Sequence, residues 1–369
     1  MSDVHASQSI LTIDLGRIVA NYQGLRARLS GAQCAGVVKA DAYGLGATRV
    51  APALAGAGCH EFFVATIEEG VEIRPLLPAT AAVYVLSGVL ASEAPALIAH
   101  GLVPVLNDFG QIAIWAKAAR GVGRRLPAII HFDTGMSRLG LTPQDASDIA
   151  ATPTHLDGID LRYVMSHLAC AEERDQPMNA RQLAAFGSIR ANWPKTRASL
   201  ANSSGIFLGP AYHFDLARPG CALYGINPTP GLPNPVAQAA VLSGKILQIR
   251  DVDPPGTVGY GATHRVGRRT RVATVAAGYA DGWLRTLSNR GGAYYGDVRV
   301  PFIGRVSMDL ITLDVTAAPH AKPGDAVELM GEHLPVDVVA ELAGTIGYEV
   351  MTRLGRRFAR VYVNDPARQ

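Results

Sequence analysis

Short apolar runs alternate with helix-like segments from residue 34 to residue 218. Before them, residues 14–30 place apolar side chains at helical spacing, with Asp14 at the capping position. Residues 109–119 and 178–193 are further predicted helices. The apolar runs are residues 34–38, 61–65, 82–86, 103–106, 128–132, 163–167, 198–202 and 214–218. Eight strands with intervening helices predict a (β/α)8 TIM-type barrel, although a doubly wound open sheet would show the same alternation.

Polar residues follow several of these runs at the point where each predicted strand ends. They are Lys39, Asp133, His167, Asn202, Ser203 and Arg218. Barrel enzymes build their active sites at the C-terminal ends of the strands. The pattern therefore predicts that these side chains share one site.

A different pattern follows residues 227–235, a proline-rich stretch that can continue neither a helix nor a central strand. Short alternating segments separated by glycine turns predict an antiparallel β domain with one short helix at residues 336–347. The predicted strands are residues 242–249, 270–276, 298–303, 310–315 and 326–330. We therefore expect a barrel over residues 1–233 and a mostly antiparallel β domain over residues 234–369, with which the first few residues can pair.

Composition and charge narrow the class of protein. The chain has 369 residues, of which 48% are hydrophobic and 18% charged, as in a folded, core-rich protein. A net charge of +3 is too small to indicate nucleic-acid binding. Four scattered cysteines without a C-x-x-C pair predict neither a metal site nor a disulfide framework. The polar N-terminus lacks a signal pattern, and no apolar run could span a membrane, so we expect a cytoplasmic protein.

Lys39 lies at the end of the first predicted barrel strand. A charge there is costly unless it reaches solvent, a partner or a ligand. Burial can remove the proton from a lysine and leave a nucleophilic amine. A solvated lysine at a strand end is the alternative.

Three later segments supply groups that complement such an amine. Residues 133–140 hold Arg138 in a glycine-punctuated loop that can bind a carboxylate, and Ser203 opens a helix that can seat an anion. Arg218 precedes Gly220 and Cys221, whose backbone can approach a phosphate. A surface turn and an ordinary helix cap are the alternatives for the first two. A lysine amine, a phosphate seat and an arginine able to face a ring nitrogen indicate pyridoxal 5′-phosphate. No G-x-G-x-x-G turn follows a predicted strand, which disfavours a nicotinamide cofactor.

With these groups in this order, the chain resembles the alanine racemase family, fold type III enzymes that use pyridoxal phosphate. In the first domain the resemblance rests on V-V-K-A-D-A-Y-G-L-G, D-T-G-M-S-R-L-G, A-N-S and R-P-G-C-A-L-Y-G. In the second it rests on G-Y-G-A-T, G-Y-A-D-G-W, G-R-V-S-M-D and G-Y-E-V, in the family's order. Together these motifs cover nearly the whole chain.

The resemblance implies an isomerase that interconverts L-alanine and D-alanine and supplies D-alanine for peptidoglycan precursors. Lys39 would carry the cofactor and act as base on one face of the substrate, and Tyr260 would act on the other face from the second subunit of a homodimer. Arg138, the Met308 backbone and Tyr279 match substrate-binding positions. The positions that match cofactor-binding residues are Lys39, Tyr43, His167, Ser203, Arg218, Gly220, Cys221 and Tyr348.

Two bases flanking a planar centre are what racemisation requires. A phenol in water keeps its proton up to about pH 10. Tyr260 would therefore need nearby positive charge, which Arg218 can supply directly or through His167.

His131 departs from the family pattern, because many members carry there a lysine whose carbamate orients the substrate arginine. Histidine does not form that stable carbamate. We expect an anion such as chloride, or a nearby carboxylate, to hold Arg138 instead. The alternative is a neutral core histidine that fills space.

Three rival functions remain open. One is a fold type III racemase of broader specificity. Another is a decarboxylase on the same scaffold, although the usual histidine-glycine-serine loop and reactive cysteine are absent. The third is a non-catalytic pyridoxal-phosphate carrier, but carriers resemble the barrel alone.

Overall fold

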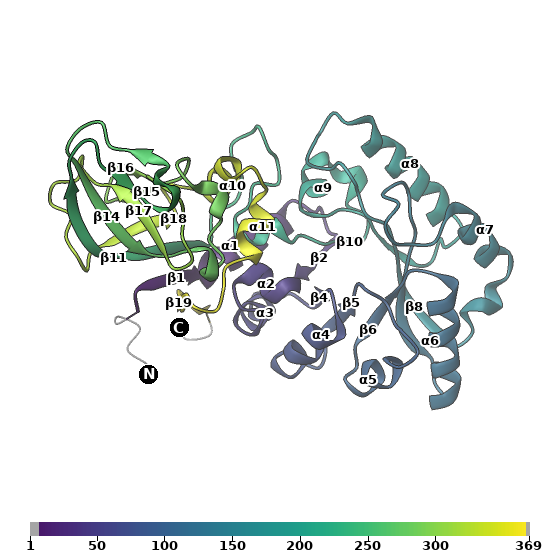
Figure 1. Ribbon diagram of the computed structural model, residues 1–369. Coiled ribbons are helices and arrows are strands. Elements are labelled where there is room, and N and C mark those ends of the chain that lie inside the picture. Colours follow the sequence, from purple (N-terminus) through teal and green to yellow (C-terminus); the bar gives the residue numbers. More distant parts are fainter. Residues whose placement is uncertain (1–6, 367–369) are drawn as a thin grey trace.

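The computed structural model describes residues 7–366. It contains a barrel of strands and helices joined to a separate domain of mostly antiparallel strands (Figure 1). Within the described residues, no helix is long and apolar enough to cross a membrane.

Parallel strands form the barrel in sequence order, from β3 to β9. The barrel strands are β2 (Gln33–Cys34), β3 (Gly36–Val37), β4 (Glu61–Val64), β5 (Ala82–Val85), β6 (Val103–Leu106), β7 (Leu126–His131), β8 (Ile159–Met165), β9 (Arg197–Ser199) and β10 (Leu216–Ala217). β10 closes the ring, because it pairs with β2 and the Arg218 amide donates to the Ala201 carbonyl at 2.8 Å. The predicted barrel is confirmed, and the open sheet is wrong.

Helices cover the outside of the barrel (Figure 1). The α-helices of this domain are α1 (Leu15–Ala27), α2 (Lys39–Gly44), α3 (Ala47–Gly56), α4 (Ile67–Ile73), α5 (Ala94–Ala99), α6 (Phe109–Val122), α7 (Pro143–Ala151), α8 (Pro177–Arg190) and α9 (Ser203–Leu208). Its 3-10 helices are η2 (Arg74–Leu76), η3 (Pro153–Leu156), η4 (Pro210–Tyr212) and η5 (Cys221–Tyr224). Asp14 caps α1 as predicted, since its side chain accepts from the Arg17 amide at 2.9 Å.

The second domain has an antiparallel sheet built around the long strand β11. Its strands are β11 (Ala240–Val252), β12 (Thr257–Val258), β13 (His264–Arg265), β14 (Thr270–Ala276), β15 (Gly292–Tyr295), β16 (Val298–Pro301), β17 (Leu310–Asp314), β18 (Ala326–Met330) and β19 (Ala359–Val363). The N-terminal strand β1 (Ser9–Asp14) pairs antiparallel with β11 and parallel with β19.

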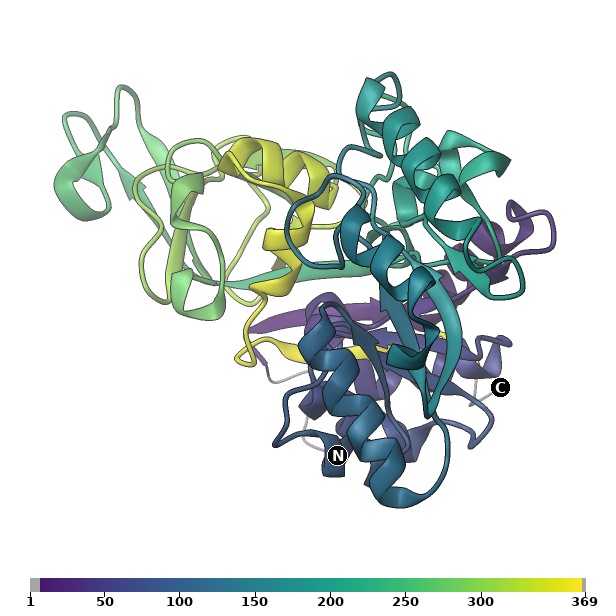
Figure 2. The same ribbon diagram turned by 90° about the vertical axis from the view of Figure 1, so that its right-hand side faces the viewer.

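Several short 3-10 helices and two α-helices complete this domain. They are η6 (Tyr260–Ala262), η7 (Tyr279–Asp281), η8 (Arg285–Leu287), α10 (Val336–Ala343) and α11 (Gly347–Thr352). The single predicted helix over residues 336–347 is wrong, because Gly344 in the left-handed region ends α10 and α11 begins three residues later. Figure 2 shows α10 and α11, in yellow, between the sheet and the barrel.

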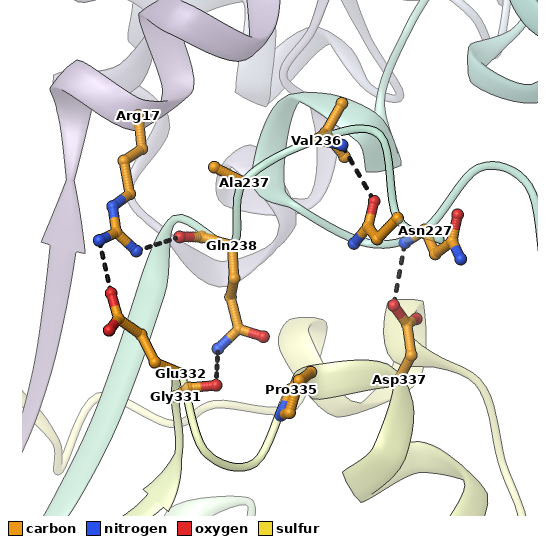
Figure 3. A pocket seen from close by; sticks show the side chains of 10 residues that line it. Arg17, Asn227, Val236, Ala237, Gln238, Gly331, Glu332, Pro335 and Asp337 are labelled. Carbon is orange, nitrogen blue, oxygen red and sulfur yellow. Dashed lines mark hydrogen bonds and ion pairs between the residues drawn. The ribbon is translucent and has the colours of Figure 1, made fainter. Parts of the chain in front are cut away.

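Side chains from both domains meet beside α1 (Figure 3). Arg17 forms an ion pair with Glu332 at 2.6 Å, and the Gln238 side-chain amide donates to the Gly331 carbonyl at 3.0 Å. The Asn227 amide donates to the Asp337 carboxylate at 3.0 Å. These bonds surround a pocket of about 630 Å³, none of whose lining residues belongs to the predicted site.

Candidate functional site

Lys39 is the first residue of α2, and only Val38 separates it from β3. The segment that follows Lys39 is a left-handed helical turn, because residues 40–43 have φ between 52° and 57°. Such a turn costs L-residues roughly 1–2 kcal/mol each. The Glu69 carboxylate offsets part of that cost, since it accepts from the Ala40 and Ala65 amides, both at 2.7 Å.

The second domain also holds this turn in place. Arg360 donates to the Gly44 carbonyl and Tyr362 to the Leu45 carbonyl, both at 3.0 Å. Gly44 has φ +81°, and a Cβ there would lie 2.5 Å from the Met351 carbonyl oxygen. The strained segment that carries Lys39 is therefore fixed by the barrel on one side and by the β domain on the other.

Burial lowers the pKa of the Lys39 amine below its ordinary value, the nearby Arg138 cation lowers it further, and the Glu69 carboxylate opposes both. The shift increases the fraction of uncharged amine at neutral pH. The structure thus gives Lys39 the property that a nucleophile or proton acceptor needs.

Arg218 is a buried cation with only neutral acceptors around it. It is 4% exposed and donates to the Ser199 hydroxyl and to the Ser166 carbonyl, the latter at 2.7 Å. No carboxylate of the described residues lies within 4.0 Å of it. Burial lowers its pKa to about 10, so it remains charged at neutral pH. Its position suits it to face a polar acceptor.

His167 lies next to Arg218. Its Nδ1 is 3.3 Å from an Arg218 nitrogen and must accept, because a guanidinium only donates. Burial and the Arg218 charge lower the pKa of His167 well below the ordinary value. The ring is therefore neutral, with its hydrogen on Nε2.

Ser203, Gly220 and Cys221 converge at the ends of β9 and β10. The Ser203 hydroxyl accepts from the Gly220 amide at 2.9 Å and from the Ala222 amide at 3.2 Å. A Cβ on Gly220 would lie 2.4 Å from the Tyr43 hydroxyl, so only glycine fits there. Hydroxyls and amide donors clustered in this way suit a phosphate group.

Aromatic rings enclose the same corner. The Tyr43 ring lies 4.8 Å from that of Tyr224 and 6.0 Å from that of Tyr348 on α11. Burial raises the pKa of both Tyr43 and Cys221, so both stay protonated. Because Tyr348 lies on α11, the second domain also contributes to this corner.

Arg138 is exposed on the loop that follows β7. Asp133 shapes the loop by accepting from the Gly135 and Met136 amides at 2.8 and 2.9 Å. No carboxylate of residues 7–366 lies within 4.0 Å of Arg138, so the expected carboxylate partner is wrong. The anion stays a prediction.

Tyr260, Tyr279 and Met308 lie on the second domain and are 72%, 40% and 54% exposed. Tyr260 begins η6 between β12 and β13, and Tyr279 begins η7. The Ala280 amide donates to the Met308 carbonyl at 2.9 Å, which joins η7 to the loop before β17. Arg357 reinforces this joint through Asp281 at 2.9 Å and Asp309 at 2.7 Å.

The predicted site residues thus form two groups. The barrel-mouth group consists of Lys39, Tyr43, Arg138, His167, Ser203, Arg218, Gly220, Cys221 and Tyr348. The β-domain group consists of Tyr260, Tyr279 and Met308. Within the described part of the chain, no hydrogen bond, ion pair or ring contact joins Lys39 to the β-domain group.

Sequence reasoning missed four residues that hold parts of this site in place: Glu69, Arg357, Arg360 and Asn107, whose Oδ1 lies 2.8 Å from Nδ1 of His131. Asn107 directly follows β6, so the rule that selected polar residues at strand ends would have found it. Glu69, Arg357 and Arg360 carry no such signal. Their roles depend on backbone groups and carboxylates brought close only by folding.

Comparisons with known proteins match nearly the whole chain to one family. One family profile, described as alanine racemase, N-terminal domain, matches residues 13–228, and a second, described as alanine racemase, C-terminal domain, matches residues 239–362. An alanine racemase of Rhodospirillum rubrum is 52% identical over 357 residues, 96% of each chain. A catabolic alanine racemase of Mesorhizobium japonicum is 50% identical over 97% of this chain and 94% of its own.

A solved structure shares the fold. Alanine racemase from Bartonella henselae, determined with covalently bound pyridoxal phosphate, is 40% identical and superimposes with a TM-score of 0.93. The superposition covers 97% of this chain and 100% of the Bartonella henselae chain.

Proposed function

Because this chain belongs to the alanine racemase family and catalyses the pyridoxal-phosphate-dependent interconversion of L-alanine and D-alanine, we propose that Lys39 and Tyr260 are its two proton-transferring residues. The observation that carries the proposal is the half-buried Lys39 amine at the end of a barrel strand. Its pKa is lowered, chiefly because the amine is buried. Inversion at the α-carbon needs a proton acceptor on one face and a donor on the other.

The barrel mouth fits the cofactor. Ser203, the Gly220 and Cys221 backbone, Tyr43 and Tyr348 would hold the phosphate, because their hydroxyls and amides converge where a Cβ on Gly220 would collide. When bound, pyridoxal phosphate withdraws electrons from the α-carbon and so acidifies its proton.

Arg218 would face the ring nitrogen. A guanidinium cannot give up its proton to that nitrogen, so it acts there only as a hydrogen-bond donor. Ser199 and Ser166 fix its direction, and Nδ1 of His167 accepts from it as well. Arg218 thereby positions the cofactor and limits how strongly it withdraws electrons.

Arg138 and the Met308 backbone would bind the substrate carboxylate, and Tyr279 would line the entry to the site. Arg138 is exposed and has no carboxylate of residues 7–366 within ion-pair distance, so its planar fork is free for a substrate. Met308 and Tyr279 are held side by side by the bond between the Ala280 amide and the Met308 carbonyl.

Tyr260 would reach the site of a second copy of this chain, which makes the active unit a homodimer with shared sites. Tyr260 is 72% exposed, and within the described chain no hydrogen bond or ring contact joins it to Lys39. Two copies related by a twofold axis would each supply one β-domain group to the other's barrel mouth.

In the cell, the enzyme would work in the cytoplasm and supply D-alanine for peptidoglycan precursors. Broader substrate specificity is the second candidate. Comparing turnover of alanine with that of serine and lysine separates the two, because faster racemisation of either larger amino acid would contradict the alanine assignment.

Exchange of the α-proton in deuterated water tests the two-base proposal with each alanine enantiomer. Tyr260→Phe should still exchange the proton of the enantiomer whose hydrogen faces Lys39, while inversion falls on the order of 10²- to 10⁴-fold. Lys39→Ala should lose both reactions. Full inversion by Tyr260→Phe would contradict the proposal, as would trapping of the cofactor by borohydride on another lysine.

A further inference from the structure

His131 ends β7 and is only 8% exposed. Its Nδ1 lies 2.8 Å from Oδ1 of Asn107. The orientation of that amide is fixed, because its nitrogen donates to the Leu86 carbonyl at 3.2 Å and to the Val105 carbonyl at 2.8 Å. An amide oxygen only accepts, so Nδ1 of His131 must carry the hydrogen. The lone pair therefore lies on Nε2.

Charged groups surround this ring on several elements. Arg218 follows β10, Asp133 and Arg138 lie on the loop after β7, and His167 follows β8. Burial, together with the Arg218 and Arg138 cations, lowers the pKa of His131 to about 4 against the pull of Asp133. The ring is neutral at physiological pH, and Nε2 has no hydrogen-bond partner among the described residues.

The loop that carries Arg138 begins and ends at His131. The Leu141 amide donates to the His131 carbonyl, and the Asp133 amide donates to the Leu141 carbonyl, both at 2.8 Å. His131 therefore lies at the base of the Arg138 loop. A guanidinium has five N–H donors, of which a bidentate carboxylate uses two. The others need acceptors once a substrate displaces water.

We propose that His131 is a positioning residue: when alanine binds, its Nε2, which has no partner among the described residues, accepts a hydrogen bond from Arg138 and thereby aligns the guanidinium with the alanine carboxylate. The inference rests on the proposed substrate role of Arg138. Asn107 fixes the tautomer of His131. No added anion is required to hold Arg138. The neutral imidazole is suited to this task, because an imidazolium would repel Arg138 and offer no acceptor.

Two substitutions of similar length test the acceptor. His131→Met removes it and should raise the KM for both alanine enantiomers about 10- to 100-fold, with a smaller change in kcat. His131→Gln can place an amide oxygen near the position of Nε2 and should restore most of the affinity. Equal KM values in the two variants would overturn the proposal, as would a wild-type KM that falls on addition of chloride.

Asn107→Asp supplies a readout that a merely structural role would not change. A carboxylate against Nδ1 should raise the pKa of His131, so the alanine KM should become pH-dependent and improve as pH rises through the new value. Adding His131→Gln should abolish that dependence. A pH profile that stays like that of the wild type in Asn107→Asp would contradict the proposal.

Arg138→Lys separates this inference from the function on which it rests. If Arg138→Lys leaves KM unchanged, the substrate role of Arg138 fails. If Arg138→Lys raises KM but His131→Met does not, only the role of His131 fails. The visible spectrum of the bound cofactor should stay unchanged in the His131 variants, and its loss would assign His131 to cofactor binding instead.

Discussion

The barrel-mouth group and the β-domain group differ in how much of their geometry one chain supplies. At the barrel mouth, Arg218 is 4% exposed and is bonded to groups on two neighbouring strands. On the β domain, Tyr260 is 72% exposed, and 3-10 turns and loops carry the whole group. Preorganisation is thus complete where a cofactor would sit. The described residues do not hold the exposed Tyr260 side chain in the same way.

The largest expected effect is on the racemisation activity of purified heterodimers. A dimer of one Lys39→Ala chain and one Tyr260→Phe chain should recover about half of wild-type racemisation, because one of its two sites would be intact. Each parental variant should be nearly inactive. Differently tagged, co-expressed chains purified through both tags would be assayed.

The reciprocal heterodimer is its control. When one wild-type chain pairs with a Lys39→Ala/Tyr260→Phe chain, each shared site lacks one base, so activity should disappear. Half of the wild-type activity in this second dimer would show that each site lies within a single chain.

Acidification should destabilise the barrel mouth. His131 titrates near 6.5 when unfolded and at about 4 when folded. The unfolded chain therefore binds the proton first, and stability is lost as pH falls from 6.5 towards 4, by on the order of 3 kcal/mol. Urea unfolding across this range should show a shallower decline for His131→Gln, and His167 should sustain part of the slope.

His333 on the β domain provides the opposite case. Glu328 and Asp297 raise the pKa of this half-exposed histidine. Its small contribution to folding stability is therefore present at low pH and is lost as pH rises. A His333→Gln variant that flattened the acid decline as much as His131→Gln would contradict the assignment to the barrel mouth.

Gly220→Ala should weaken cofactor binding by about one to two orders of magnitude. The new Cβ would lie 2.4 Å from the Tyr43 hydroxyl, which cannot yield without moving the phosphate corner. Equilibrium dialysis of pyridoxal phosphate measures the effect. Gly187→Ala on α8 is the matched control, because no atom lies within 4 Å of its Cβ position, and it should bind normally.

Arg357→Gln should produce the smallest effect, a rise of a few fold in the KM for alanine, because it loosens η7 and the Met308 loop. Arg269→Gln is the control, since Arg269 is also exposed and bridges two carboxylates, Asp251 and Asp253, away from the site. Equal effects of the two substitutions would remove any special role for Arg357.

Much of the barrel could be predicted because its signals are local. Each strand is a short apolar run, and the polar residues that end β3, β8 and β10 were found from position alone. β15 and β19 were missed, because short, partly buried strands in a mixed sheet show no distinctive run. The roles of Tyr260 and Met308 came only from the family resemblance.

By itself the sequence determined the alternation of strands and helices, the two-part organisation and the lysine at a strand end. Those properties follow from periodicity and residue type, which act over a few neighbouring residues. Only the tertiary structure decided the left-handed turn after Lys39, since Glu69, Arg360 and Tyr362 hold a backbone that residues 40–43 would not adopt alone. The tautomer of His131 likewise depends on Asn107, which directly follows the neighbouring strand β6, a contact that no local pattern encodes.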